Sequence, residues 1–156
     1  MLFRSFHLTD PERGLQEARR VLCSGGQVGT VTWAREWPPR AAVLWDEVLE
    51  QFGVPVLPMH GNDSGLDSVE AIRELVGRTG FEPYEIWVET IDHTFVPEDF
   101  YRLRSGYGLN RARLSTLDDR TRQMVLAKVR QRFDQLRPSD YRFRGEVVCS
   151  VSTPRT

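Results

Sequence analysis

The sequence predicts an α/β fold in which about three strands are flanked by helices. One observation is that a helix, a glycine turn and an uncharged strand follow one another over residues 10–33, because these elements make half of a β-α-β unit. Two further runs, 81–95 and 141–151, are rich in β-branched and aromatic residues, which is typical of strands. Helical periodicity fills most of the remaining chain.

The first helix is predicted to begin at Asp10 and to end before Gly25-Gly26. An aspartate can cap the first turn, and proline, here Pro11, is favoured at the next position. Glycine allows the positive φ that often follows a helix end. The strand over 27–33 is β-branched and uncharged, which predicts that both of its faces are covered. The apolar stripe of the helix consists of Leu15, Ala18, Val21 and Leu22.

Residues 34–80 are predicted to contain two helices separated by loops. Prolines indicate a loop over 34–40, and helical spacing of apolar residues predicts a helix over 41–52 that Gly53 ends. Residues 54–65 hold two prolines, two glycines, Asn62 and Asp63, too many breakers for regular structure. A helix that ends near residue 80 is then predicted to begin at Asp67, with Glu70 completing a capping box.

The second half of the chain predicts a strand, two helices and a final strand. The strand 81–95 contains Pro83, where we expect a kink, and a short helix follows over 98–104. Thr116 is the expected cap of a helix of about five turns that Pro138 closes. Its apolar stripe is Leu117, Thr121, Met124, Val125, Val129, Phe133 and Leu136.

Composition limits the class of protein. The 156 residues, 40% of them hydrophobic, predict a single domain over 1–156. A net charge of −1 gives no general attraction to nucleic acid or to an anionic membrane. Cys23 and Cys149 lack neighbouring ligands, so we expect neither a metal site nor a redox pair. Without a long apolar run or a signal peptide, the expected location is cytoplasmic.

The segment from Asp10-Pro11 through Glu17-Ala18-Arg19-Arg20-Val21-Leu22 to Gly25-Gly26 resembles class I S-adenosylmethionine (SAM) dependent methyltransferases. The order of the later elements also resembles the second half of that family. The resemblance implies a partial Rossmann-like sheet whose last two strands are antiparallel, with 34–80 as a helical insertion or lid and 1–8 as the exit of the family's fourth strand. The family transfers a methyl group from SAM to an acceptor, here expected to be a small molecule.

The family's SAM-binding half is not found in this sequence. Its glycine-rich loop follows a strand, whereas Gly25-Gly26 follows a helix and Gly106 and Gly108 follow no strand. We therefore expect no self-sufficient SAM site and no activity from the isolated chain. The strand 28–33 would also have an open edge, so we expect a homodimer, an exchange of elements, or a partner chain that supplies the missing half.

By resemblance, the residues after the fourth strand face the methyl donor and the acceptor. Leu2, Phe3 and Ser5 are then candidates for SAM contact and Phe6 for acceptor contact. His7 is a candidate general base, since imidazole titrates near neutral pH. The alternative for His7 is an ordinary polar residue near a chain end.

Four aromatic residues are candidate walls of an acceptor pocket: Trp33, Trp37, Trp45 and Tyr107. The alternative is that they are core residues, the commoner role for aromatic side chains near strand ends. Such a pocket, between Trp33, the helices of 41–76 and the segment 102–113, also fits a different class of protein. That class is a non-catalytic module that binds a small ligand or a protein partner.

Three further patterns concern nucleic-acid, metal and acid-base sites. The segment 101–113 alternates aromatic and basic residues, which suits a phosphate or single-stranded nucleic acid, or else a solvated face paired with Asp118, Asp119 or Glu98. Nucleic acid is disfavoured by the net charge. His60, Asn62 and Asp63 do not match a metal pattern. Asp92 and His93 lie next to each other on a predicted strand, so their side chains point to opposite faces.

Overall fold

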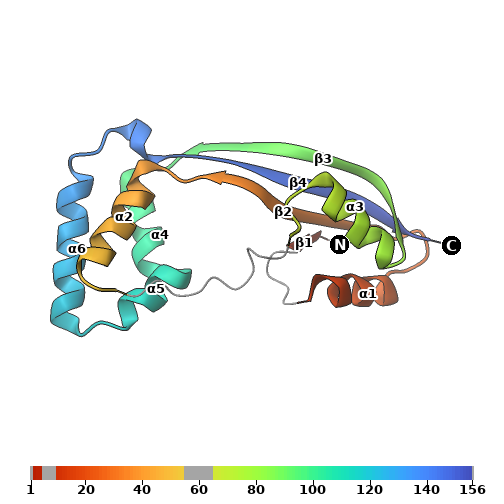
Figure 1. Ribbon diagram of the computed structural model, residues 1–156, viewed down its shortest axis with the longest axis horizontal. Helices are drawn as coiled ribbons and strands as arrows, with labels where there is room; N and C mark the ends of the chain where they lie inside the picture. The colour runs from red at the N-terminus through yellow and green to blue at the C-terminus, as the bar shows by residue number, and fades with distance from the viewer. Residues whose placement is uncertain (1, 5–9, 55–64, 156) are drawn as a thin grey trace. The chain divides into compact units, whose positions relative to one another are not determined.

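The computed structural model describes residues 2–4, 10–54 and 65–155. The chain, expected to be one domain, divides into two compact units. Unit 1 comprises 1–36, 60–91 and 145–156, and unit 2 comprises 37–59 and 92–144. In chain order the elements are β1 (Leu2–Arg4), α1 (Pro11–Val21), β2 (Val28–Trp37), α2 (Arg40–Gln51), α3 (Val69–Arg78), β3 (Phe81–Thr94), α4 (Pro97–Gly106), α5 (Gly108–Ser115), α6 (Asp119–Phe133), the 3-10 helix η2 (Pro138–Tyr141) and β4 (Arg142–Pro154) (Figure 1).

The strands form one sheet in the order β1-β2-β4-β3. β3 and β4 are antiparallel, because the Arg155 amide donates to the Gly80 carbonyl and the Phe95 amide donates to the Tyr141 carbonyl. The α/β class and the antiparallel last two strands are therefore confirmed. β1 runs parallel to β2, with Leu2 opposite Gly29, Phe3 opposite Thr30 and Arg4 opposite Val31.

β2 is one of the two interior strands of the sheet and lies between β1 and β4. The expectation that its edge is open is wrong over Gly29–Val31, because the chain's own β1 pairs there. The expectation that both faces are covered is also wrong. Val28 and Thr32 are buried, whereas Val31 and Trp33 on the other face are only half-buried. Burial therefore alternates with the two-residue period of a strand.

A polar contact lies on the buried face of β2. The hydroxyl oxygens of Thr30 and Ser150 are 2.6 Å apart in a buried hydrogen bond between β2 and β4. Burying a hydroxyl without a hydrogen-bond partner costs free energy. The hydrogen bond between the two hydroxyls avoids this cost for both residues. This pair fixes which residues of the two strands face each other.

Helices α1 and α3 pack together in unit 1 (Figure 1). The predicted cap of α1 is confirmed, since the Asp10 carboxylate accepts from the Arg13 amide at 2.9 Å. Val21, predicted in its apolar stripe, is the last residue of the helix and is 53% exposed. The buried residues of this core are Leu15, Ala18, Val28, Leu66, Ile72, Leu75, Val76, Phe81 and Val148.

The cap of α3 differs from the prediction by one residue. Ser68, not Asp67, is the N-cap, and its hydroxyl accepts from the Ala71 amide at 3.2 Å. The two residues are both good capping types. The helix therefore begins one residue later than the capping-box pattern predicts, with Glu70 in its first turn.

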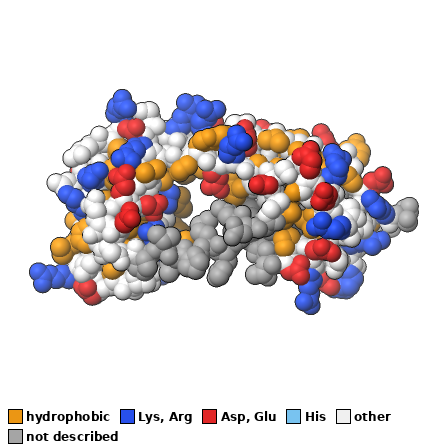
Figure 2. Space-filling view, in the orientation of Figure 1, with side chains coloured by type: hydrophobic (Ala, Val, Ile, Leu, Met, Phe, Trp, Pro, Cys, Tyr) orange, Lys and Arg blue, Asp and Glu red, His pale blue; other side chains and the backbone are white. Residues whose placement is uncertain are grey.

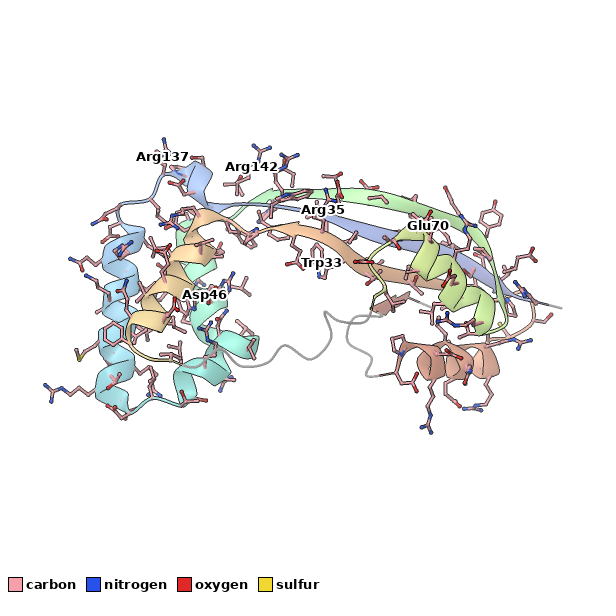
Figure 3. All side chains as sticks on the ribbon, viewed as in Figure 1. Trp33, Arg35, Asp46, Glu70, Arg137 and Arg142 are labelled. Carbon is pink, nitrogen blue, oxygen red and sulfur yellow. The ribbon has the colours of Figure 1, made fainter. Side chains whose placement is uncertain are left out.

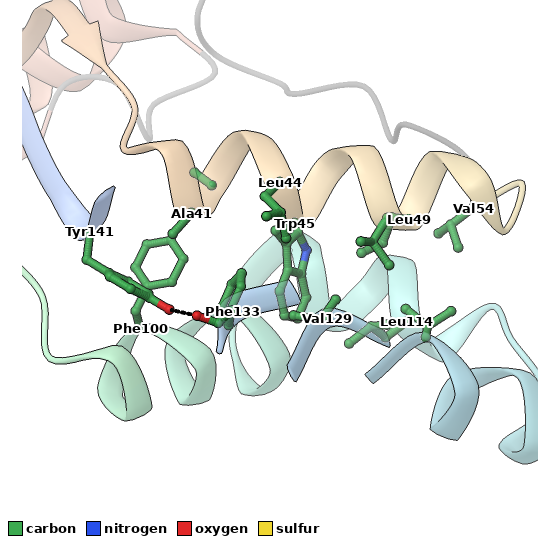
Figure 4. Close-up of a cluster of buried hydrophobic side chains, with 13 residues drawn as sticks. Ala41, Leu44, Trp45, Leu49, Val54, Phe100, Leu114, Val129, Phe133 and Tyr141 are labelled. Atoms are coloured by element: carbon green, nitrogen blue, oxygen red, sulfur yellow. Dashed lines mark hydrogen bonds between the residues drawn. The ribbon is translucent and has the colours of Figure 1, made fainter. Parts of the chain in front are cut away.

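Unit 2 has its own core, built from α2, α4, α5, α6 and η2 (Figure 4). Aromatic rings meet edge to face in it, with the centroids of Phe133 and Tyr141 5.7 Å apart. The Tyr141 hydroxyl donates to the Phe133 carbonyl at 3.3 Å. The buried residues are Ala41, Ala42, Leu44, Trp45, Val48, Leu49, Val54, Phe100, Leu114, Val125, Val129, Phe133 and Tyr141.

Two features of the helices in unit 2 correct the predictions. Helix α5 was not predicted at all. The long helix α6 is capped by Asp118 instead of Thr116, since the Asp118 carboxylate accepts from the Thr121 amide at 2.9 Å. Met124, expected in the buried stripe, is exposed. None of the described helices combines the length and apolar character needed to cross a membrane.

The segment 34–80, expected to form one helical insertion or lid, is divided between the two units. Residues 34–37, expected in a loop, continue β2. Helix α2 then belongs to unit 2, where it packs against α6, whereas α3 belongs to unit 1, where it packs against α1.

Candidate functional site

The carboxyl end of β2 is the first candidate site, and it lies in unit 1 up to Glu36. Among the described residues, the last pair between the parallel strands is Arg4 with Val31, and β2 continues for six residues beyond it, through Trp37. In open α/β sheets, ligands bind at the carboxyl ends of parallel strands. The side chains of this extension include the half-buried Trp33 and the exposed Arg35 (Figure 3).

A carboxyl group with an altered pKa lies on the same extension. The Glu36 side chain is exposed by area, but neighbouring protein atoms still desolvate its carboxyl group and raise its pKa. Desolvation favours the neutral form, so Glu36 gains a proton more readily than an ordinary glutamate. Trp33 and Arg35 share one face of the strand, where they offer an apolar surface and a cation, whereas Glu36 points to the other face.

The amino-terminal candidates are only partly placed. Leu2 and Phe3 lie on β1, whose backbone pairs with β2. Ser5, Phe6 and His7 lie outside the described residues. Contact of these five residues with SAM or an acceptor, including the role of His7 as a base, stays a prediction.

The four aromatic candidates have different environments. Trp45 is 0% exposed, and its ring packs edge to face with Tyr101, so its expected contact with an acceptor is wrong for this structure and its role is in the core. Trp37 is 42% exposed and Tyr107 is 69% exposed, so both can contact a bound molecule. Trp33 belongs to unit 1, and Trp37 and Tyr107 to unit 2. Their meeting in one acceptor pocket stays a prediction.

A second candidate site is an ion cluster in unit 2. The Arg113 side chain is only 6% exposed, and its Nη1 donates to the Asp46 carboxylate at 2.5 Å. Asn110 accepts from the same nitrogen at 3.4 Å. These contacts join α5 to α2, on which Asp46 lies (Figure 3).

Arg104 adds a second cation to the cluster. Its pKa is lowered, first by desolvation and then by the charge of Arg113, while the charge of Asp46 opposes the shift. Its guanidinium lies 5.4 Å from the centroid of the Phe100 ring. One carboxylate thus stands near two guanidinium groups, which leaves a net positive charge among these three side chains.

The partners expected for the arginines of 101–113 are wrong for two of them. Arg113 pairs with Asp46, and Arg102 pairs with Asp99 at 3.0 Å. The three expected partners have other roles: Asp118 caps α6, Asp119 pairs with Arg122, and Glu98 pairs with Arg130 at 3.6 Å. On the face in view, Figure 2 shows acidic and basic side chains interspersed.

The remaining candidates have structural surroundings. Asp92 accepts two hydrogen bonds from the Arg142 guanidinium, at 2.8 and 2.5 Å, and the His93 ring lies edge to face with Phe95. The thiols of Cys23 and Cys149 are free. Among residues 2–4, 10–54 and 65–155, no three His, Cys, Asp or Glu side chains gather as a metal site would require. His60, Asn62 and Asp63 lie outside those ranges.

The glycine pairs lie at helix ends. Gly25, with φ of +75°, and Gly26 lie between α1 and β2. Gly106 ends α4 and Gly108, with φ of +58°, begins α5. A loop that holds an adenosyl cofactor must leave a strand and enter a helix, so these glycines do not fit SAM.

No protein-family model matches the chain, and no curated protein does. A protein from Bacillus halodurans described as a methyltransferase is 19% identical with a TM-score of 0.48, over 99% of this chain and 68% of that one. A type II methyltransferase from Anaeromyxobacter dehalogenans is 15% identical with a TM-score of 0.48, over 97% and 61%. Phosphoethanolamine N-methyltransferase 2 of Haemonchus contortus, solved with phosphomonomethylethanolamine and S-adenosylhomocysteine, is 16% identical with a TM-score of 0.35, over 99% and 32%.

The chain thus spans about two thirds or less of the length of these proteins. Their low identities and TM-scores give no independent support to a shared activity.

Proposed function

We propose that the chain is the acceptor-side part of a SAM-dependent methyltransferase and that it needs further residues, on the same or another polypeptide, to bind SAM. The observation that carries this proposal is the sheet order β1-β2-β4-β3 with β1 parallel to β2. The family resemblance of 10–33 implies the same arrangement, with a fourth strand on one side of 28–33 and the last strand on the other.

The contribution of this chain to methyl transfer is positioning. Transfer between two bound molecules depends chiefly on holding donor and acceptor in line. The extension of β2 beyond β1 offers Trp33 as an apolar wall for a small acceptor. Glu36 lies three positions from Trp33 on this strand and points to the opposite face of the sheet, so no proton transfer from that acceptor is assigned to it. The described glycines do not fit the cofactor, so its binding is assigned to residues that complete the sheet.

Association is part of the proposal. β1 has only three residues, and its outer side is the edge of the sheet among the described strands. Open strand edges pair readily with other chains. We therefore expect either self-association or binding of a chain that supplies the missing half. Light scattering at micromolar concentration tests self-association, for which the expected mass is twice 18.0 kDa. A mass of 18.0 kDa contradicts it.

Calorimetric titration with SAM tests the proposed division of labour. The isolated chain is expected to release no binding heat at SAM concentrations up to about 1 mM, the weak end of the usual affinity range. A polypeptide extended by the upstream coding sequence, if that sequence encodes a glycine-rich half in frame, is expected to bind SAM. Micromolar binding by the isolated chain, or no binding by such an extended polypeptide, contradicts the proposal.

One observation favours a second function, that of a non-catalytic module for a small ligand. Unit 2 contains a pocket of 290 Å³ whose lining residues all belong to that unit. This pocket lies between α4, α6 and η2. The separate pocket beside Trp33 and 102–113 stays a prediction. This function would be favoured if the pocket binds a ligand while neither the isolated chain nor the extended polypeptide binds SAM.

A further inference from the structure

The pocket in unit 2 is made by residues that are far apart in the sequence. Helix α4 contributes Glu98 and Tyr101, the end of α6 contributes Arg130 and Asp134, and Tyr141 closes η2. Its 290 Å³ is at the lower end of the volumes of small-molecule sites. The pocket therefore suits one small group.

Rigid aromatic rings line this pocket. Phe133 and Tyr141 are buried in the core of unit 2, with ring centroids 5.7 Å apart. The half-buried Tyr101 ring lies edge to face with Phe133 at 6.5 Å. Because the core holds these rings, they can offer a preformed surface. Aromatic faces carry negative partial charge and attract cations.

Arg130 already shows this attraction within the pocket. Its guanidinium carbon lies 4.0 Å from the centroid of the Tyr101 ring, and its Nη1 lies 3.6 Å from the Glu98 carboxylate. One cation is thus held by one aromatic face and one carboxylate. The side chains of Arg130 and Glu98 are both more than half exposed, so moving Arg130 out of the pocket costs little free energy.

A second carboxylate makes the pocket net negative. Asp134 lies in the lining, and no basic side chain in the described part of the chain lies within ion-pair distance of it. Burial raises the pKa of Tyr141 first, and the charge of Asp134 adds to that shift, so the Tyr141 ring stays neutral. Because Glu98 already pairs with Arg130, the charge of Asp134 can be neutralised by a bound cation.

We propose that this pocket binds a small organic cation of the guanidinium or alkylammonium class, held by its aromatic rings and by Asp134. The ligand competes with Arg130 for Tyr101 and Glu98. This inference goes beyond methyl transfer and does not depend on SAM binding.

The proposal predicts opposite effects for two charge changes in one pocket. Asp134→Asn is expected to weaken binding of n-butylguanidinium by about twofold to fivefold, the effect of about 0.5–1 kcal/mol. Arg130→Gln is expected to strengthen binding by a similar factor, because it removes the competing cation. Asp99→Asn is the matched control, since that carboxylate is on α4 but pairs with Arg102 outside the lining.

NMR titration of the whole chain measures these affinities through the ring signals of Tyr101 and Tyr141, with Tyr101→Phe assigning the first. n-Butylurea, the neutral isostere, is expected to bind at least about threefold more weakly than n-butylguanidinium. Equal binding of the two would overturn the proposal, as would weaker binding by Arg130→Gln, which indicates an anion site. Binding of an arginine-rich peptide without binding of n-butylguanidinium would also overturn it, in favour of a protein partner.

Discussion

The ion pair between Asp46 and Arg113 gives the sharpest stability prediction. Asp46→Ala removes the carboxylate 2.5 Å from a guanidinium that is 6% exposed, while Asp46 itself is 51% exposed. Breaking a fully buried pair costs about 3–5 kcal/mol. Since water reaches Asp46, and Asn110 still accepts from Arg113 at 3.4 Å, we expect a loss of about 2 kcal/mol in the free energy of unfolding.

Urea unfolding measures this loss. With a slope of about 2 kcal/mol per molar urea, the midpoint is expected to fall by about 1 M. Glu17→Ala is the control, because its pair with Arg20 is exposed on both sides and should contribute less than about 0.5 kcal/mol. Asp46→Ala with a midpoint no lower than that of Glu17→Ala would refute the account of this pair.

Three further predictions concern a helix cap, a buried hydroxyl and an exposed ion pair. Ser68→Ala should destabilise α3 by about 1 kcal/mol, and Asp67→Ala by clearly less, in the same urea assay. Thr30→Val should cost about 1–2 kcal/mol, because the serine hydroxyl opposite it loses its partner. Hydrogen bonding by Arg142 lowers the pKa of Asp92, so the stabilisation from this pair is present at neutral pH and is lost as the pH falls through that lowered pKa. Arg142→Gln should return this pKa toward its usual range in an NMR titration, and an unchanged pKa would contradict the assignment.

Helix ends that depend on a single residue were predicted correctly from the sequence. The cap by Asp10 and the end of α2 near Gly53, with φ of +67°, both follow from single residues. The caps of α3 and α6 were misplaced because two capping residues stand close together at each start. Ser68 and Asp118 are the ones used. Tertiary packing decides where such a helix begins, and the sequence does not display that packing.

Helix α5 was missed because its stability depends on distant residues. It has eight residues, few enough to be marginal as an isolated helix. Its buried Arg113 is held by Asp46, 67 positions away. The same reason explains why the ion cluster and the cation pocket were not predicted as sites. Only the interleaving of aromatic and basic residues over 101–113 pointed toward this part of the chain.

The candidate site at β2 was predicted in part. The uncharged run 28–33 indicated an interior strand, and β2 does lie between β1 and β4. Its continuation through Trp37 was missed because Pro38-Pro39 indicated a loop over 34–40, whereas the strand runs up to these prolines and includes Arg35 and Glu36. One face of β2 is only partly covered, and charged side chains are compatible with such a strand.

The pairing of β1 with β2 carries the proposed function, and backbone NMR contacts test it most directly. The account predicts nuclear Overhauser contacts that join Phe3 to Thr30 and Arg4 to Val31, the parallel register. Contacts in the reverse order, with Arg4 near Gly29, or no contacts between these two segments, would contradict it.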